Sequence, residues 1–120
     1  MVQRYLTKPY LIDGLKFDLR LYVLIYGVDP LRIYIYRDGL VRFATELYEK
    51  PDPNKNMSNL FMHLTNYSIN KASENFKADE YDGHKRSLHS LLKHLESEGH
   101  DPDLIMNKIS DLIIKTVITV

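Results

Sequence analysis

The sequence predicts an α+β fold in which an antiparallel β-meander is followed by two helices. Apolar and polar residues alternate through residues 14–27, "GLKFDLRLYVLIYG", as in a strand with one apolar face. Leucines recur at positions 88, 91, 92 and 95, which is the spacing of an amphipathic helix. At 120 residues, the chain has the length of one small domain with a modest core.

The first half of the chain reads as β. Residues 2–6 are a short apolar-rich run, and residues 16–26 alternate as a strand should. A turn around Asp29-Pro30 leads into a second alternating stretch. Within it, residues 37–39 (Arg-Asp-Gly) are typical of a hairpin turn with Gly39 at a positive φ. These signals predict a meander of three or four strands.

The second half reads as α after a loop over residues 50–59, which holds two prolines and three asparagines. The leucine-rich helix is expected to stop at Gly99. Asp101 as N-cap and Pro102 at the first helical position predict the start of the second helix. Its apolar periodicity still continues at Val120, so we expect the chain to be a piece of a longer protein.

Composition limits the classes of function. Sixteen basic and sixteen acidic residues cancel, so bulk charge gives no argument for nucleic-acid or membrane binding. The chain has no cysteine and hence no disulfide or thiolate metal site. No apolar run approaches the roughly 20 residues of a membrane helix, and the N-terminus lacks the apolar core of a signal peptide. We therefore expect a cytosolic protein that binds neither nucleic acid nor membrane.

Lys16, Asp18 and Arg20 occupy alternate positions of the first long strand and so share one face. One interpretation is a solvated face with an alternating ladder of ion pairs. The other is a line of site residues beneath a polyanion, because arginine grips phosphate or carboxylate bidentately and lysine adds a point charge. The pattern alone leaves both interpretations open.

Other polar groups are weaker candidates. His63, Thr65 and Asn66 cluster in "FMHLTNYSIN", although Thr-Asn pairs cap and turn more often than they bind ligands. Arg37 and Arg42 suit solvated strand positions. Further histidines surround the first helix at a spacing unsuited to zinc and are expected at the surface: His84, His89, His94 and His100.

Three blocks of this sequence resemble the tubulin tyrosine ligase-like family, whose members are ATP-grasp amino-acid ligases. The blocks are "QRYLTKPYLIDGLKFDLRLYVLI", "PLRIYIYRDGLVRFATELY" and "MHLTNYSINK", in the order the family has them. The two helical stretches, "GHKRSLHSLL" and "ISDLIIKTVI", are similar to the polyglutamylase branch. The resemblance implies that residues 1–120 form part of an ATP-grasp ligase domain and lack its upstream and downstream parts.

The resemblance also implies a role for individual residues. Arg20 and Arg42 match catalytic positions. Arg20 matches the arginine beside the γ-phosphate and the reacting carboxylate, and Arg42 matches a cation that binds the incoming amino acid or acyl phosphate. The remaining matches are to nucleotide-binding positions: Gln3, Arg4 and Leu6 at the adenine hinge, Lys16 and Asp18 near the ribose and phosphates, and His63, Thr65 and Asn66 lining the pocket. Magnesium is implied too, but the family's ligands for it match no residue of this chain.

The function implied is ATP-dependent ligation of free glutamate to glutamate side chains in the acidic C-terminal tails of tubulin. Catalysis of this type rests on positioning and on neutralising phosphate charge. The implied setting is the cytoskeleton, with the cilium or basal body. Two alternatives stay open: a glycine or tyrosine ligase of the same family, and a non-catalytic piece that binds tubulin or nucleotide. We expect the isolated 120-residue chain to be inactive or nearly so.

Overall fold

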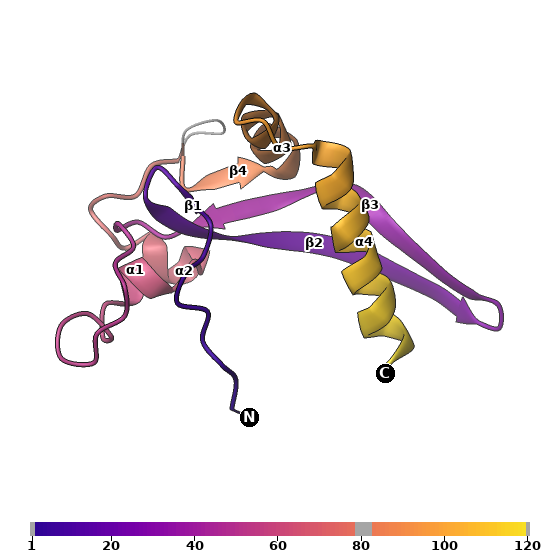
Figure 1. Ribbon diagram of the computed structural model, residues 1–120, viewed down its shortest axis with the longest axis horizontal. Helices are drawn as coiled ribbons and strands as arrows, with labels where there is room; N and C mark the ends of the chain where they lie inside the picture. The colour runs from indigo at the N-terminus through magenta and orange to yellow at the C-terminus, as the bar shows by residue number, and fades with distance from the viewer. Residues whose placement is uncertain (1, 79–82, 120) are drawn as a thin grey trace. The chain divides into compact units, whose positions relative to one another are not determined.

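The computed structural model describes residues 2–78 and 83–119, and these residues form two compact units. The first unit takes in the described parts of residues 1–19 and 41–86. The second takes in the described parts of residues 20–40 and 87–120. Four strands in the order β1-β2-β3-β4 form one sheet, and four helices complete the chain (Figure 1). The predicted α+β class is confirmed.

Burial alternates along the second half of β3, whereas most of the C-terminal half of β2 is exposed on both faces. They are β1 (Leu11–Ile12), β2 (Leu15–Val28), β3 (Leu31–Phe43) and β4 (Lys85–Ser87). β1 pairs antiparallel with β2 through a turn at Asp13 and Gly14, whose φ angles are 52° and 75°. The strand predicted over residues 16–26 is confirmed. Residues 2–6, which were read with the β half, contain no helix or strand.

The predicted hairpin turn at residues 37–39 is wrong. The chain reverses at Asp29-Pro30, next to Gly27 with a φ of 77°, and Gly39 lies buried inside β3. A Cβ at Gly39 would stand 2.7 Å from the backbone oxygen of Arg20, so the glycine serves close strand approach rather than a turn. Asp38 accepts hydrogen bonds from Gly39 N at 2.8 Å and from His89 N at 3.3 Å.

The core of the first unit gathers where β3 ends. Val41, Phe43, Ala44 and Met62 are almost fully enclosed, and the ring of Phe17 on β2 lies 5.4 Å from that of Phe43. Because side chains alternate along a strand, this packing turns the neighbours of Phe17 to the other face of β2.

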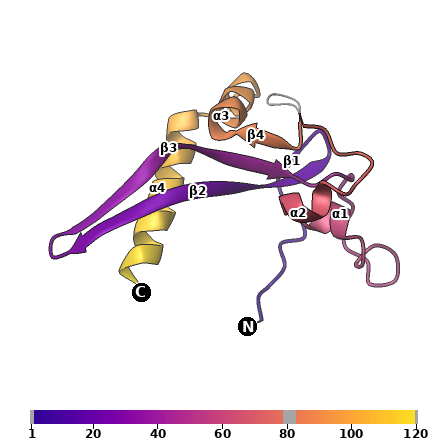
Figure 2. The ribbon, with the colours of Figure 1, turned by 180° about the vertical axis from the view of Figure 1, so that it is seen from behind.

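Two short helices complete the first unit. They are α1 (Leu60–His63) and α2 (Tyr67–Asn70), which pack against each other (Figure 2). The backbone N of Thr45, just beyond β3, donates to the oxygen of Phe61 in α1 at 3.1 Å. Phe43 N donates to His84 O at 2.9 Å next to β4. The loop predicted over residues 50–59 is confirmed and leads directly into α1.

The second unit contains both predicted helices, α3 (Leu88–Ser97) and α4 (Pro102–Ile118), which pack together. In α3 the leucine stripe is buried at Leu88, Leu91 and Leu95, and Gly99 ends it with a φ of 90°. The Asp101 carboxylate caps α4 by accepting from two backbone N–H groups of its first turn. None of the described residues of α4 is buried.

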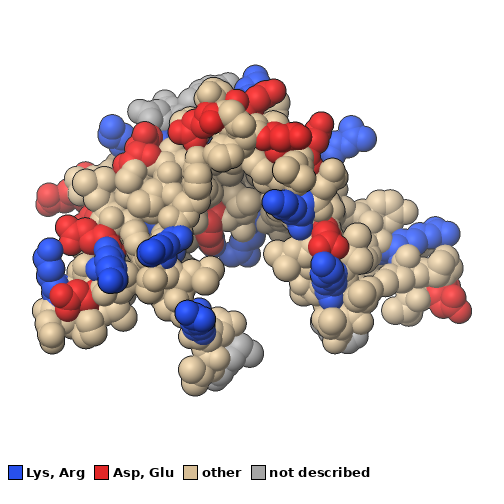
Figure 3. Space-filling view, in the orientation of Figure 1, with Lys and Arg blue, Asp and Glu red and all other residues tan. Residues whose placement is uncertain are grey.

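Positive and negative side chains are mixed on the face of the molecule that Figure 3 draws. On the face drawn in Figure 3, lysine and arginine side chains are interspersed with aspartate and glutamate, and neither sign forms a broad patch. This agrees with the net charge of zero and places the electrostatic argument on individual side chains.

Candidate functional site

Lys16 is held by two hydrogen bonds from its amine. Its amine donates to the Tyr5 hydroxyl at 3.1 Å and to the backbone oxygen of His63 at 3.0 Å. It also lies 4.8 Å from the centre of the Tyr5 ring, within the range of a cation–π contact. β2 thus places Lys16 at the end of α1, beside His63.

His63 is held on both ring nitrogens. Its Nε2 lies 3.0 Å from the backbone oxygen of Asn56, and its Nδ1 lies 2.9 Å from the Tyr5 hydroxyl. Because a carbonyl oxygen only accepts, Nε2 carries a proton and donates to Asn56, and Nδ1 shares a hydrogen bond with the Tyr5 hydroxyl. The Tyr5 oxygen in turn accepts from Lys16. The edges and faces of the Tyr5 and Tyr48 rings enclose the imidazole.

Tyr48 belongs to the same cluster. Its hydroxyl donates to the backbone oxygen of Thr7 at 3.2 Å, which ties the N-terminal segment to the stretch after β3. Burial raises the pKa of Tyr48 above its ordinary value, the hydrogen bond and charge of Tyr5 raise it further, and the positive charge of Lys16 opposes them. Tyr48 is therefore a neutral hydrogen-bonding group at neutral pH.

Asp18 and Arg42 form a bidentate pair across β2 and β3. Arg42 donates from Nε to Oδ1 at 2.9 Å and from Nη2 to Oδ2 at 2.5 Å. Arg42 was interpreted from the pattern alone as a solvated cation, but its side chain is only 19% exposed. Asp18 is paired with the neighbouring strand, and Lys16 turns to Tyr5 and His63. The simple ladder of ion pairs along β2 is not what the structure shows.

Four further predicted residues are exposed. Gln3, Arg4 and Leu6 are exposed in a segment without helix or strand, and Tyr5 between them makes its contacts with Lys16 and His63. Arg20 is exposed and belongs to the second unit, whereas Lys16 and Asp18 belong to the first.

Thr65 and Asn66 lie in the connection between α1 and α2. Thr65 is buried, and Asn66 precedes α2, where its backbone oxygen accepts from Ile69 N and Asn70 N. The side chain of Asn70 then joins this connection to Thr45 at the exit of β3. Composition gave no signal for Asn70, because one asparagine in a short polar helix looks like a surface residue.

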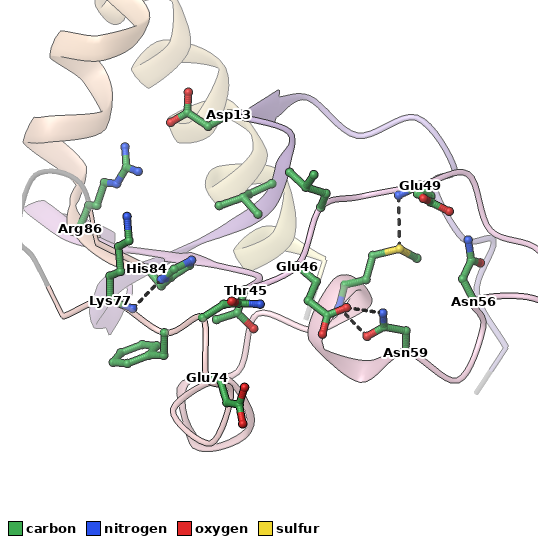
Figure 4. Close-up of a pocket in the computed structure, with 15 residues that line it drawn as sticks. Asp13, Thr45, Glu46, Glu49, Asn56, Asn59, Glu74, Lys77, His84 and Arg86 are labelled. Carbon is green, nitrogen blue, oxygen red and sulfur yellow. Dashed lines mark hydrogen bonds between the residues drawn. The ribbon is translucent and has the colours of Figure 1, made fainter.

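A separate pocket of about 830 Å³ opens elsewhere in the first unit (Figure 4). Carboxylates and cations both line it, among them Glu46, whose carboxylate accepts from Asn59 at 2.6 Å. None of the predicted site residues is among its described lining residues. His84 lines it too, with its Nδ1 accepting from Lys77 N at 2.9 Å and its ring stacked on Phe76. His84 is therefore not the simple surface histidine that was predicted.

The cluster around Lys16 combines positively charged and hydrogen-bonding groups. It brings an amine, a guanidinium and two phenol hydroxyls near one end of β2. A second chemistry is not apparent, since no group of three or more histidine, aspartate or glutamate side chains among the described residues is placed to hold a metal ion. Sequence reasoning missed Tyr5, Tyr48 and Asn70. Of these three, only Tyr5 is adjacent in the sequence to predicted site residues.

Comparison with known proteins agrees with the resemblance in sequence. The sequence profile of the tubulin-tyrosine ligase family matches residues 1–120. A probable beta-tubulin polyglutamylase of Tetrahymena thermophila is 56% identical over 99% of this chain, and tubulin polyglutamylase TTLL13 of Mus musculus is 53% identical over 98%. Tubulin monoglutamylase TTLL4 of Mus musculus is 50% identical over 99%.

The match covers this chain almost completely but only a small part of each relative. The chain spans 10% of the Tetrahymena protein, 14% of TTLL13 and 10% of TTLL4. Among the described residues, no helix has the length and apolar character that crossing a membrane requires. The profile match along the chain and the high identity to several members lead to one conclusion: the chain belongs to the tubulin-tyrosine ligase family.

Proposed function

We propose that this chain forms part of the nucleotide and amino-acid site of an ATP-dependent ligase that joins glutamate to glutamate side chains in tubulin tails. The observation that carries the proposal is the anchored Lys16 amine beside the His63 segment, on the strand that also carries the Asp18–Arg42 pair. Relatives named as tubulin polyglutamylases, at 53–56% identity, supply the substrate class. The proposed setting is the cytoskeleton, including that of cilia.

The residues present suit ATP as a substrate. The Lys16 amine offers a compact positive charge, and the guanidinium of Arg42 offers planar N–H donors of the kind that bind carboxylate and phosphate. Asp18 fixes the orientation of Arg42 by accepting from two of its nitrogens. A site that is ordered before its ligand arrives loses less entropy on binding.

In the proposed reaction, ATP supplies a phosphoryl group that activates the acceptor carboxylate as an acyl phosphate. The amine of free glutamate then forms the amide bond, and inorganic phosphate and a proton leave. We assign Lys16 to the phosphates, Arg20 to the γ-phosphate and the reacting carboxylate, and Arg42 to the incoming amino acid. Gln3, Arg4 and Leu6 are proposed at the adenine, and His63, Thr65 and Asn66 along the pocket. Magnesium is proposed for the whole ligase, and among the described residues no group of three or more histidine, aspartate or glutamate side chains is placed to hold it.

We propose that the amino acid the ligase adds is glutamate rather than glycine or tyrosine. Relatives at 50–56% identity carry names of both polyglutamylases and a monoglutamylase, and both names specify glutamate. The proposal therefore fixes glutamate and leaves first addition and chain elongation as outcomes to be measured.

The test uses a chimera in which this chain replaces the matched segment of full-length mouse TTLL13. Incorporation of labelled glutamate into tubulin is measured for the chimera and for its Lys16→Ala and Arg20→Ala variants. We expect each variant to lose about 100-fold in kcat/KM, the scale for removing one group that stabilises transition-state charge. Matched controls are Lys93→Ala and Arg37→Ala, which remove exposed cations and are expected to retain activity.

Two results would count against the proposal. Unchanged ligation by both site variants would reject the assignment of Lys16 and Arg20. Incorporation of glycine or tyrosine in place of glutamate would reject the amino acid. Ligation by the 120-residue chain alone would contradict the expectation that it is inactive by itself.

A further inference from the structure

Asn70 is the most completely satisfied polar side chain in the first unit. It is 1% exposed, and its amide makes four hydrogen bonds to residues before it in the sequence. An asparagine side chain has one acceptor oxygen and two N–H donors. All of these are used, so the amide can hold only one orientation without leaving a buried polar group unpaired.

The two ends of this amide contact different parts of the unit. Its oxygen accepts from Thr45 N at 3.1 Å and from Thr45 Oγ1 at 2.8 Å, at the exit of β3. Its nitrogen donates to Leu64 O at 2.8 Å and to Asn66 O at 3.1 Å, in the connection between α1 and α2. Asn70 therefore links the sheet to residues 63–66, the segment that carries three predicted site residues.

The same segment also orients Lys16. The backbone oxygen of His63 accepts from the Lys16 amine at 3.0 Å, and the next carbonyl along the chain, that of Leu64, accepts from Asn70. The two carbonyls belong to consecutive peptide units that share the Cα of Leu64, so a displacement of that Cα moves the planar unit that carries the His63 carbonyl. The position of the Lys16 amine thus depends on the amide of Asn70.

We propose that Asn70 is a positioning residue for the nucleotide site: it fixes residues 63–66 and, through the His63 carbonyl, the Lys16 amine. This inference rests on the proposed function, in which Lys16 binds the phosphates of ATP. Asn70 itself touches no proposed ligand group. Its substitution therefore changes nucleotide affinity by moving Lys16.

The central variant is Asn70→Asp in the TTLL13 chimera. The substitution preserves the size of the side chain and the oxygen that Thr45 contacts, but it removes both donors to the 63–66 segment. We expect the KM for ATP to rise at least tenfold while kcat changes less than threefold. Thr45→Val removes only one bond on the strand side and is expected to raise the KM less than threefold.

Two controls separate a general loss of protein stability in the Asn70 variant from a displacement of the Lys16 amine. Leu91→Ala removes a buried leucine of α3 in the second unit and serves as a destabilised control with an unchanged KM for ATP. All variants are compared at a temperature at which circular dichroism shows them folded. If Asn70→Asp does not fold, Asn70→Ser is measured in its place, with the same expected rise in KM.

Coupling to Lys16 gives the sharpest readout. If Asn70 acts through Lys16, Asn70→Asp raises the KM less than threefold further in a Lys16→Gln background, because the shared interaction is already lost. The inference would be overturned if Asn70→Asp raised the KM for ATP by the same factor with and without Lys16→Gln. An unchanged KM in a folded Asn70 variant would overturn it too. If Lys16→Gln alone leaves the KM unchanged, the proposed function fails instead, so the two failures are distinguishable.

Discussion

Arg42 grips the carboxylate of Asp18 with two hydrogen bonds, from Nε at 2.9 Å and from Nη2 at 2.5 Å. The two residues are 24 positions apart and meet across neighbouring strands. This pair orders the guanidinium before any ligand arrives. Lys16 and Asp18, two of the charged residues that alternate on β2, each have a partner outside that strand.

The Asp18–Arg42 pair is expected to stabilise the chain modestly. The Asp18 side chain is 40% exposed, so solvent screening limits the interaction despite its good geometry. A double-mutant cycle with Asp18→Asn and Arg42→Gln, measured by urea unfolding, should give a coupling free energy of about 1 kcal/mol. A coupling free energy indistinguishable from zero would show that the pair serves no stabilising role.

Gly39→Ala is expected to destabilise the chain by about 2 to 3 kcal/mol, because the new Cβ would stand 2.7 Å from Arg20 O and 2.9 Å from Leu21 Cδ2. Gly99→Ala is the control. A Cβ added at Gly99 would have no atom within 4 Å. Only the φ of 90° disfavours alanine there, and we expect it to lower the free energy of unfolding by about 1 kcal/mol. Thermal unfolding compares the two, and an equal or smaller effect at Gly39 would refute the close approach of the strands.

Tyr48 should make stability fall at alkaline pH. Because burial raises the pKa of Tyr48 in the folded chain, the unfolded chain releases this proton first as pH rises. The contribution is complete below the ordinary tyrosine pKa of about 10 and is lost as pH rises through the raised value. Urea unfolding at about pH 8 and about pH 10.5 should show a larger loss for the natural chain than for Tyr48→Phe. Equal losses would contradict the raised pKa.

The two C-terminal helices should respond differently to truncation of a leucine. Leu91 on α3 is 3% exposed, so Leu91→Ala is expected to cost about 3 kcal/mol of unfolding free energy. Leu112 on α4 is 66% exposed, so Leu112→Ala should change it by less than about 0.5 kcal/mol. A large cost at Leu112 in the isolated chain would mean that α4 is packed more tightly than the structure shows.

The parts of the fold that sequence predicts are those governed by local rules. The alternation on β2, the leucine stripe of α3, the stop at Gly99 and the Asp101–Pro102 helix start depend on residues a few positions apart. The turn predicted at Gly39 is wrong. Asp38-Gly39 has the local composition of a turn, but the close approach of β2 keeps Gly39 inside β3. Contact with another strand is not encoded in the spacing of neighbouring residues.

The candidate site could likewise be predicted only in part from the sequence. Strand periodicity placed Lys16 and Asp18 on one face, and family resemblance gave roles to His63 and Arg42, which the residue pattern had marked only as weaker candidates. Neither predicted that Tyr5 bridges Lys16 and His63, because those side chains come from positions 11 and 58 residues away from Tyr5. Asn70 was missed for the same physical reason: its importance lies in burial and in four specific hydrogen bonds, which composition does not report.

The most direct test of the site is the dissociation constant for ATP, measured by calorimetry on the TTLL13 chimera with and without Lys16→Gln. The account predicts at least a tenfold weaker affinity for Lys16→Gln and an unchanged affinity for Lys93→Gln, which alters an exposed lysine on α3. An affinity for ATP that is the same in all three proteins would contradict the central claim that the Lys16 cluster binds the nucleotide.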